Sequence, residues 1–180
     1  MGSDAPIALG TPAYRRLTLA MLFAGFSTFS LLYSVQPLLP LFATQFGLTA
    51  EGASLAVSLA TGPLAIGILF AGFVSDRVGR RPLMIAAMFA AGALTLAAAV
   101  VPGWSGLLVL RFLTGVALAG VPAVAMAYVA EEVDSGSVGA AIGLYIAGSA
   151  IGGMGGRLVA SLVADFGGCD SRSPRSASRG

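Results

Sequence analysis

The residues of this chain that can take part in chemistry are few, and arginine supplies most of them. Only 10% of the 180 residues are charged, and all ten basic residues are arginine, because the sequence contains no lysine and no histidine. The missing histidine excludes histidine triads and histidine metal sites, and the missing lysine excludes Schiff-base and P-loop chemistry. The single cysteine, Cys169, excludes an internal disulfide. The sequence therefore predicts no catalytic residue, no metal site, no cofactor and no enzyme activity.

The densest group of polar residues is a segment that we call the charged turn. Its charged and glycine residues are Gly72, Asp76, Arg77, Gly79, Arg80 and Arg81. Arginine side chains that reach the membrane surface would account for the basic residues, and a positive φ would account for Gly79. Neither explains Asp76, a carboxylate at the edge of an apolar run and directly before the arginines.

A further charge, Arg111, lies inside an apolar run. Counted from Gly106, it lies about 8 Å into the membrane at 1.5 Å per residue. A charge at this depth is costly and normally faces a partner or a water-filled cavity, although a guanidinium can also reach back to the outer interface. We expect Arg111 to line a cavity for substrate or coupling. Gln36, the one amide of the first apolar run, is expected to face the same cavity.

Glycine recurs at every fourth position of the last apolar run, as Gly148, Gly152 and Gly156. In a helix this spacing makes a flat face that lets another helix backbone approach closely. We therefore expect these three residues, here called the glycine stripe, to pack helices together. Arg157 follows the stripe directly and is expected to mark the outer end of the helix.

The elements that must position these residues are long and apolar. The sequence is 57% hydrophobic and its mean hydropathy is +0.90, which excludes a water-soluble domain because too few polar residues remain to cover a core. We expect an all-α membrane protein with five transmembrane helices, since each apolar run has about the 20 residues that cross the hydrocarbon. The runs are 17–42, 53–74, 83–101, 107–129 and 138–158. A cleaved signal peptide in place of the first run is disfavoured, because the run is too long and lacks a cleavage site.

The arginines also orient the chain. Five of them, Arg15, Arg16, Arg77, Arg80 and Arg81, fall before the first run or between the second and third, whereas the loops 43–52 and 102–106 contain none. By the positive-inside rule, residues 1–16 form a cytoplasmic tail and the charged turn is cytoplasmic.

The charged turn resembles a signature of the major facilitator superfamily, Gly-x-Leu-x-Asp-Arg-x-Gly-Arg-Arg/Lys-x-x-Leu, which lies between helices two and three of that family. Six of its residues match, while Val74 replaces the first leucine and Leu83 comes one residue early. The resemblance implies twelve helices in two six-helix halves, of which this chain holds the first five. It also implies a gate, in which Asp76 caps a helix of the second half and pairs with arginines there.

Further matches to the same family are partial. The spacing around Arg111 and Gly115 resembles the fourth-helix motif of proton-coupled members, which implies a coupling role for Arg111. The glycine stripe resembles the antiporter signature Gly-x-x-x-Gly-Pro-x-x-Gly-Gly, but Gly153 stands where proline belongs. The segment QPLLP, which begins at Gln36, is similar to a YnfM-type, drug-efflux-like subgroup of bacterial inner-membrane transporters.

The composition changes abruptly in residues 169–180, which read CDSRSPRSASRG. We expect this tail to be disordered and out of frame, so that the chain is a truncated fragment. The function we expect is a secondary transporter of small solutes, with proton-coupled efflux by alternating access. Its partners would be the lipid bilayer, a small-molecule substrate, protons and the missing second half, and not nucleic acid. The alternative is a non-transporting membrane protein or inactive fragment that binds partner helices through its glycine faces.

Overall fold

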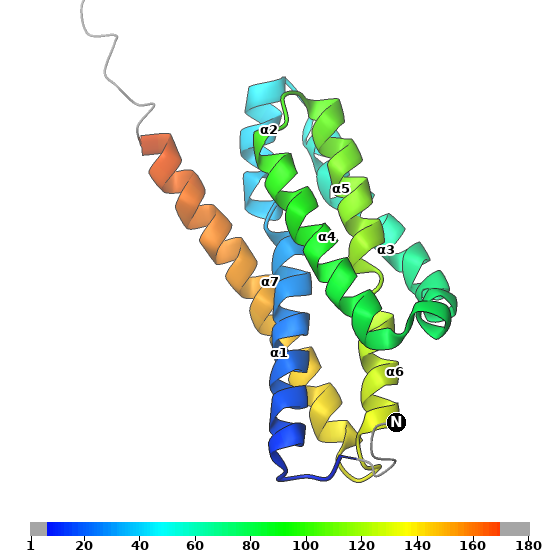
Figure 1. Ribbon diagram of the computed structural model, residues 1–180. Coiled ribbons are helices and arrows are strands. Elements are labelled where there is room, and N and C mark those ends of the chain that lie inside the picture. Colours follow the sequence, from blue (N-terminus) through cyan, green and yellow to red (C-terminus); the bar gives the residue numbers. More distant parts are fainter. Residues whose placement is uncertain (1–6, 170–180) are drawn as a thin grey trace, which may run out of the picture.

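The computed structural model describes the backbone of residues 7–169 and the side chains of residues 7–164, which form a bundle of antiparallel helices (Figure 1). The helices are α1 (Pro12–Tyr33), η1 (Gln36–Leu38), α2 (Leu39–Phe46), α3 (Ala50–Val78), α4 (Arg80–Val100), α5 (Trp104–Leu118), α6 (Pro122–Glu132) and α7 (Val138–Cys169). Five stretches are long and apolar enough to cross a membrane: Pro12–Phe46, Ala50–Val78, Arg80–Val100, Trp104–Glu132 and Val138–Ala164. We number them as the first to fifth spans. The prediction of an all-α membrane protein with five transmembrane helices is confirmed.

The first and fourth spans are interrupted. In the first, α1 ends at Tyr33 and the three-residue η1 leads into α2, because Pro37 has no N–H to continue the helical ladder. We call residues 34–38 the α1 break. In the fourth span, α5 ends before Gly120 and Pro122 begins α6. The runs 17–42 and 107–129 were each predicted to be one continuous helix, and neither break was expected from the sequence.

The connection between the second and third spans is a single residue. α3 continues through Val78 and α4 begins at Arg80, so only Gly79 separates them. Its φ of +94° and ψ of 146° belong to a region that is almost reserved for glycine. The predicted runs 53–74 and 83–101 imply a connection over residues 75–82, and this boundary is wrong, because polar side chains alone do not end a helix and Gly79 does.

The two ends of the bundle differ in charge. In Figure 1 the start of α1 and the α6–α7 connection form the lower tip of the bundle, and the α3–α4 turn lies above them in its lower half, whereas the α2–α3 and α4–α5 turns lie at the upper end. The lower end holds five arginines of the chain. The upper end holds an aromatic cluster, in which the rings of Phe42 and Phe46 lie 5.9 and 5.6 Å from that of Trp104. Such a pattern is typical of two different membrane interfaces.

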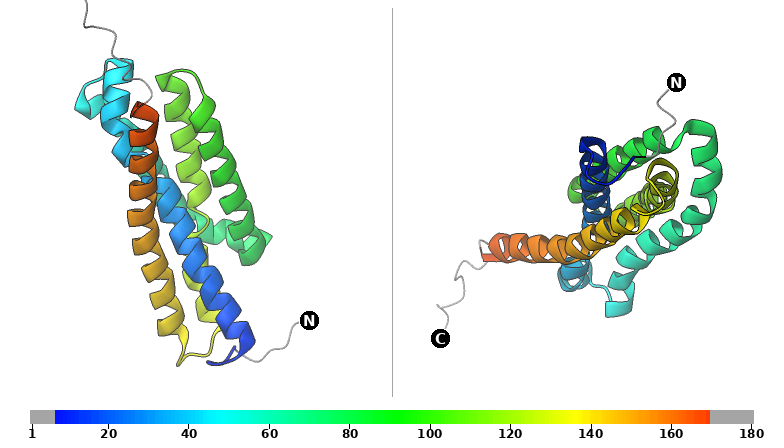
Figure 2. Two further views of the ribbon diagram at one scale, coloured as in Figure 1. Left: turned by 90° about the vertical axis from the view of Figure 1, so that its left-hand side faces the viewer. Right: turned by 90° about the horizontal axis from the view of Figure 1, so that it is seen from below.

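The glycine stripe lies against α1, and the two helices run side by side (Figure 2). A methyl group added at any of the three glycines would overlap a backbone carbonyl of α1. The pairs are Gly148 with Leu22, Gly152 with Phe26, and Gly156 with Ser30. Because both sets recur every four residues, the two backbones follow each other for two turns.

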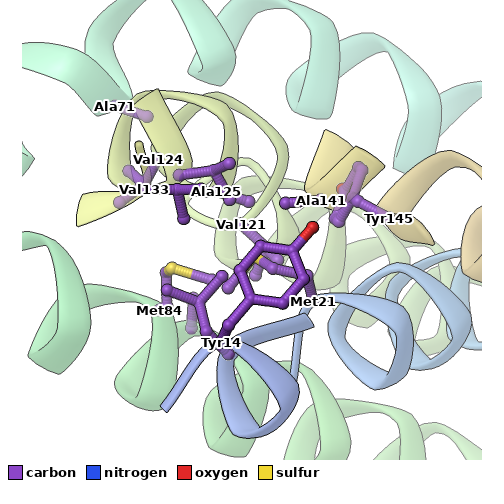
Figure 3. Packing of buried hydrophobic residues seen from close by; sticks show 13 residues of the cluster. Tyr14, Met21, Ala71, Met84, Val121, Val124, Ala125, Val133, Ala141 and Tyr145 are labelled. Atoms are coloured by element: carbon purple, nitrogen blue, oxygen red, sulfur yellow. The ribbon is translucent and has the colours of Figure 1, made fainter. Parts of the chain in front are cut away.

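The main core forms around α6, which lies between the α1–α7 pair and helices α3 and α4 (Figure 3). Val124 and Val129 of α6, and Val121 directly before it, are at most 1% exposed and belong to a cluster with side chains from the other four spans. The outer surface of the bundle is also apolar. The side chains of Phe73 and Phe89, for example, are 73% and 76% exposed. An apolar exterior of this kind suits lipid and not water.

The expectation of an out-of-frame tail falls mostly outside the described residues. α7 continues through Cys169, and residues 170–180 are not among those that the structure describes.

Candidate functional site

The α1 break leaves backbone carbonyl groups without helical partners inside the bundle. The last four carbonyls of a helix lack an intrahelical donor, and together they carry partial negative charge. In α1 the carbonyl of Ser30 still accepts a hydrogen bond from the N–H of Ser34, at 3.0 Å. The carbonyls of Leu31 and Leu32, one turn before Pro37, instead accept hydrogen bonds from a side chain of another span, and that of Leu31 accepts a second one from Oγ of Ser34 at 3.1 Å. The break is therefore suited to a cation.

Arg111 of α5 supplies that cation. Its Nη2 donates to the carbonyl oxygen of Leu32 at 2.7 Å, its Nη1 to that of Leu31 at 3.4 Å, and its Nε to that of Ala56 in α3 at 3.3 Å. The side chain is 1% exposed. A guanidinium with donors on three sides can join three spans in this way, whereas an ammonium group cannot present the same fork.

This position of Arg111 decides between the two partners that the sequence left open. Among the described residues the guanidinium is enclosed and faces backbone carbonyls, so it does not reach back to the outer interface, and its place in a substrate cavity stays a prediction. The physical reason is that the α1 break supplies backbone acceptors within reach, which the sequence pattern did not reveal. A role of Arg111 in coupling remains a prediction.

Arg157 of α7 approaches the same break from the other side. Its Nε donates to Oε1 of Gln36 at 2.5 Å, and its guanidinium carbon lies 4.5 Å from the ring centroid of Tyr33. The side chain of Arg157 is exposed, and α7 continues to Cys169 beyond it. The expectation that Arg157 marks the end of the helix is therefore wrong. Gln36 meets Arg157 and not Arg111.

The charged turn forms a separate polar surface at the lower end of the bundle. Arg80 makes an ion pair with Glu131 at the end of α6. Asp76 is exposed and, among the described residues, has no recorded hydrogen bond or ion pair. It lines an open cavity of about 480 Å³ together with Arg80, Tyr128 and Glu131. The carboxylate is thus available to a partner that approaches this end.

Sequence reasoning missed two members of these sites. Glu131 was not among the predicted site residues, and nothing in the local sequence pairs it with Arg80. For Arg157 a signal existed, because the apolar residues 158–164 continue the run after it. That continuation indicates a charge within the helix and not at its end.

Comparison with known proteins identifies the family. The family model described as Major Facilitator Superfamily matches residues 18–177, which is most of the chain. The chain belongs to the major facilitator superfamily (MFS). It is therefore a multi-pass membrane protein of a transporter family, as the charged turn predicted.

Two curated MFS relatives match over 160 residues. The chain is 46% identical to the inner membrane transport protein YnfM of Escherichia coli, covering 89% of this chain and 38% of the relative. It is 48% identical to the uncharacterized MFS-type transporter YybF of Bacillus subtilis, covering 89% and 40%. The multi-drug resistance efflux pump PmrA of Streptococcus pneumoniae is 30% identical over 148 residues, with 80% and 37% covered. The MFS chain thus spans about two fifths of these relatives, at 37–40%. No solved structure matches it.

Proposed function

We propose that this chain forms the first five helices of a secondary transporter that exports small solutes by alternating access, coupled to protons. The observation that carries the proposal is the exposed carboxylate of Asp76 beside the Arg80–Glu131 ion pair. A carboxylate held at the end of a rigid helix can cap the N-terminus of a facing helix, where free N–H groups and a positive partial charge attract it. Asp76 would then close the lower end of the bundle against a second half.

The geometry of the charged turn supports a gate. Gly79 joins α3 to α4 without any loop, so a movement of one helix carries the other with it. Arg80 ties this pair of helices to α6 through Glu131. The turn therefore moves as part of the bundle, as rocking of one half against the other requires.

Proton coupling needs a titrating group, and this chain has no acidic residue in the middle of any span. The eight acidic residues are Asp4, Glu51, Asp76, Glu131, Glu132, Asp134, Asp165 and Asp170, and none lies in the middle of a span. Arginine keeps its proton at physiological pH, so Arg111 does not carry the coupling proton itself. We therefore assign the proton-carrying carboxylate to the second half of the transporter, with Arg111 holding the first span in shape.

The test is Asp76→Asn in a chain that carries both halves, reconstituted into vesicles with a pH gradient. Uptake of two probes, ethidium and benzoate, is measured beside a matched control, Glu51→Gln, which alters an exposed carboxylate in the first turn of the same helix. We expect Asp76→Asn to reduce transport by at least about tenfold, since an interaction of a charged group is worth about 1.5–3 kcal/mol. Insertion should be unchanged for both variants. Equal transport by Asp76→Asn and the wild type would refute the gate.

The alternative function, association with partner helices through glycine faces, has less support. The glycine stripe is already covered by α1, with carbonyl groups of α1 in the space that a partner helix would need. A partner would have to displace α1 from its most extensive helix contact. We therefore favour the transporter.

A further inference from the structure

The guanidinium of Arg157 is held inside an apolar segment by contacts that direct it toward the α1 break. Twelve more helical residues follow it in α7, which is about 18 Å of helix. The side chains directly after it, Leu158 and Val159, are 58% and 62% exposed and apolar. A charge in such a place is costly unless it has a functional partner.

Two neighbours hold the guanidinium in a defined orientation. Gln36 accepts the hydrogen bond of Nε, and the ring of Tyr33 covers one face of the group at 4.5 Å. The ring also lies against α7 at Gly153, one turn before Arg157, where an added methyl group would be in ordinary contact with Cδ2 of Tyr33 at 3.4 Å. The edge formed by Nη1 and Nη2 has no recorded hydrogen bond among the described residues.

The free edge has the geometry that binds a carboxylate. Two parallel N–H groups of arginine pair with both oxygens of a carboxylate, and this two-point contact is stronger than a neutral hydrogen bond. Acidic residues are absent from long stretches of the first, second and fifth spans. These stretches are Pro12–Phe46, residues 52–75 and Val138–Ala164. Arg111, on the other side of the break, has its donors occupied by backbone carbonyls and competes for no anion.

We propose that Arg157, with Gln36 and Tyr33, is a binding site for the carboxylate of a small organic anion, which makes organic anions the substrate class of the transporter. That the bound anion is a substrate rests on the proposed transport function. That the site binds a carboxylate rests on the geometry of the three residues. Tyr33 blocks one face of the guanidinium, so the carboxylate enters in the plane of the group. The same oxyanion chemistry is offered by a lipid headgroup, and the test separates the two sources.

The experiment uses the 180-residue chain in phosphatidylcholine nanodiscs and follows binding of 4-fluorobenzoate by fluorine NMR. The neutral amide 4-fluorobenzamide has the same shape without the charge and serves as the control ligand. We expect the wild type to bind the carboxylate and not the amide. Arg157→Gln should weaken binding by about tenfold or more, and Arg157→Lys should weaken it less, because the charge remains while the fork is lost. Arg16→Gln, at the opposite end of the bundle, should bind like the wild type.

A second variant guards against misfolding of Arg157→Gln. Gln36→Leu leaves the charge of Arg157 in place but removes the oxygen that accepts its hydrogen bond and orients it. We expect this variant to bind benzoate several-fold more weakly, with unchanged helix content by circular dichroism. Equal binding of the amide, or equal affinity of Arg157→Gln and the wild type, would overturn the site. Loss of benzoate binding when phosphatidylglycerol is added to the discs would assign the site to a lipid headgroup and overturn the substrate class. If the chain binds 4-fluorobenzoate but the chain with both halves transports nothing, the proposed function alone is wrong. If the chain with both halves transports but the site binds no carboxylate, this site alone is wrong.

Discussion

Nη2 of Arg111 lies 2.7 Å from the carbonyl oxygen of Leu32, in the interior of the bundle. In an apolar medium the carbonyl needs a hydrogen-bond donor and the guanidinium needs an acceptor, and each group supplies what the other lacks. The carbonyl has lost its helical donor near the α1 break, and the guanidinium has no carboxylate within the apolar middle of the spans that it contacts, since the acidic residues of α3 lie near its two ends. An unpaired backbone group in hydrocarbon costs several kcal/mol, so the first span can break at this depth only because the fourth span brings donors to it.

The first prediction concerns the shape of that side chain. Arg111→Lys keeps the charge but cannot reach the carbonyls of Leu31, Leu32 and Ala56 together. At least one of these hydrogen bonds should then be lost, at a cost of about 1–3 kcal/mol in the free energy of unfolding. Arg111→Met should cost more because all three bonds are lost and the carbonyl of Leu32 is left without a donor. The carbonyl of Leu31, in contrast, keeps Oγ of Ser34, and that of Ala56 keeps its partner within α3. The measurement is denaturation of the detergent-solubilised chain.

Arg16→Lys is the matched control for Arg111→Lys, because Arg16 is exposed at the start of α1. It should unfold like the wild type. If Arg111→Lys also does so, the three hydrogen bonds are not what stabilises the break.

The second prediction concerns the contact between α1 and α7. Gly152→Ala puts a methyl group into the backbone of Phe26, where no flexible side chain can move aside. Overpacking of this kind should destabilise the chain by about 1–3 kcal/mol. Gly143→Ala, on the same helix, has no atom within 4 Å of the added methyl group and should be neutral or slightly stabilising. Equal stability of the two variants in an SDS titration would contradict the packing shown by the glycine stripe.

The spans could be predicted from sequence because their cause is local. Membrane thickness fixes the length of an apolar run, and a run such as 53–74 contains no charge that would leave the assignment open. The breaks could not be predicted in the same way. Proline is tolerated in transmembrane helices when neighbours satisfy the freed groups, so Pro37 and Pro122 do not by themselves decide where a helix ends. For Pro37 the decision rests on Arg111, which lies 74 positions later in the sequence.

The site was predictable in its residue types and not in its pairings. The charged turn, Arg111 and Gln36 stand out because polar groups are rare in an apolar chain. Their partners lie on other helices and are set by which faces meet. Gln36 meets Arg157 because the glycine stripe brings α7 against α1, and that register depends on backbone contact that no single helix encodes.

The third prediction separates folding from gating within the charged turn. Gly79→Ala forces a side chain into a backbone conformation that is nearly confined to glycine, at a cost of about 1–3 kcal/mol, and places a methyl group 3.3 Å from Cγ of Pro82. The chain should unfold at a lower temperature.

Gly72→Ala lies within α3, and the added methyl group has no atom within 4 Å, so the stability of this chain should be unchanged. In a two-half transporter, however, Gly72→Ala should reduce transport if a second half approaches α3 closely there. An unaltered unfolding temperature for Gly79→Ala would contradict the single-residue turn.

The last prediction fixes which end of the bundle faces the cytoplasm. Thr49 precedes the first residue of α3 and Val78 is its last, so the two lie at opposite ends of a helix of 29 residues, which is about 43 Å long. With Cys169 replaced by serine, Thr49→Cys should react with a membrane-impermeant maleimide on intact spheroplasts. Val78→Cys, which lies among the arginines, should react only after the membrane is opened, as the positive-inside rule requires. Leu69→Cys is the control, because Leu69 is 71% exposed on the apolar surface of the same helix and should meet lipid from either side. Labelling of Thr49→Cys and Val78→Cys from one side would be incompatible with a spanning α3. Labelling of Val78→Cys alone on intact spheroplasts would invert the orientation and place Asp76, the residue of the proposed gate, outside.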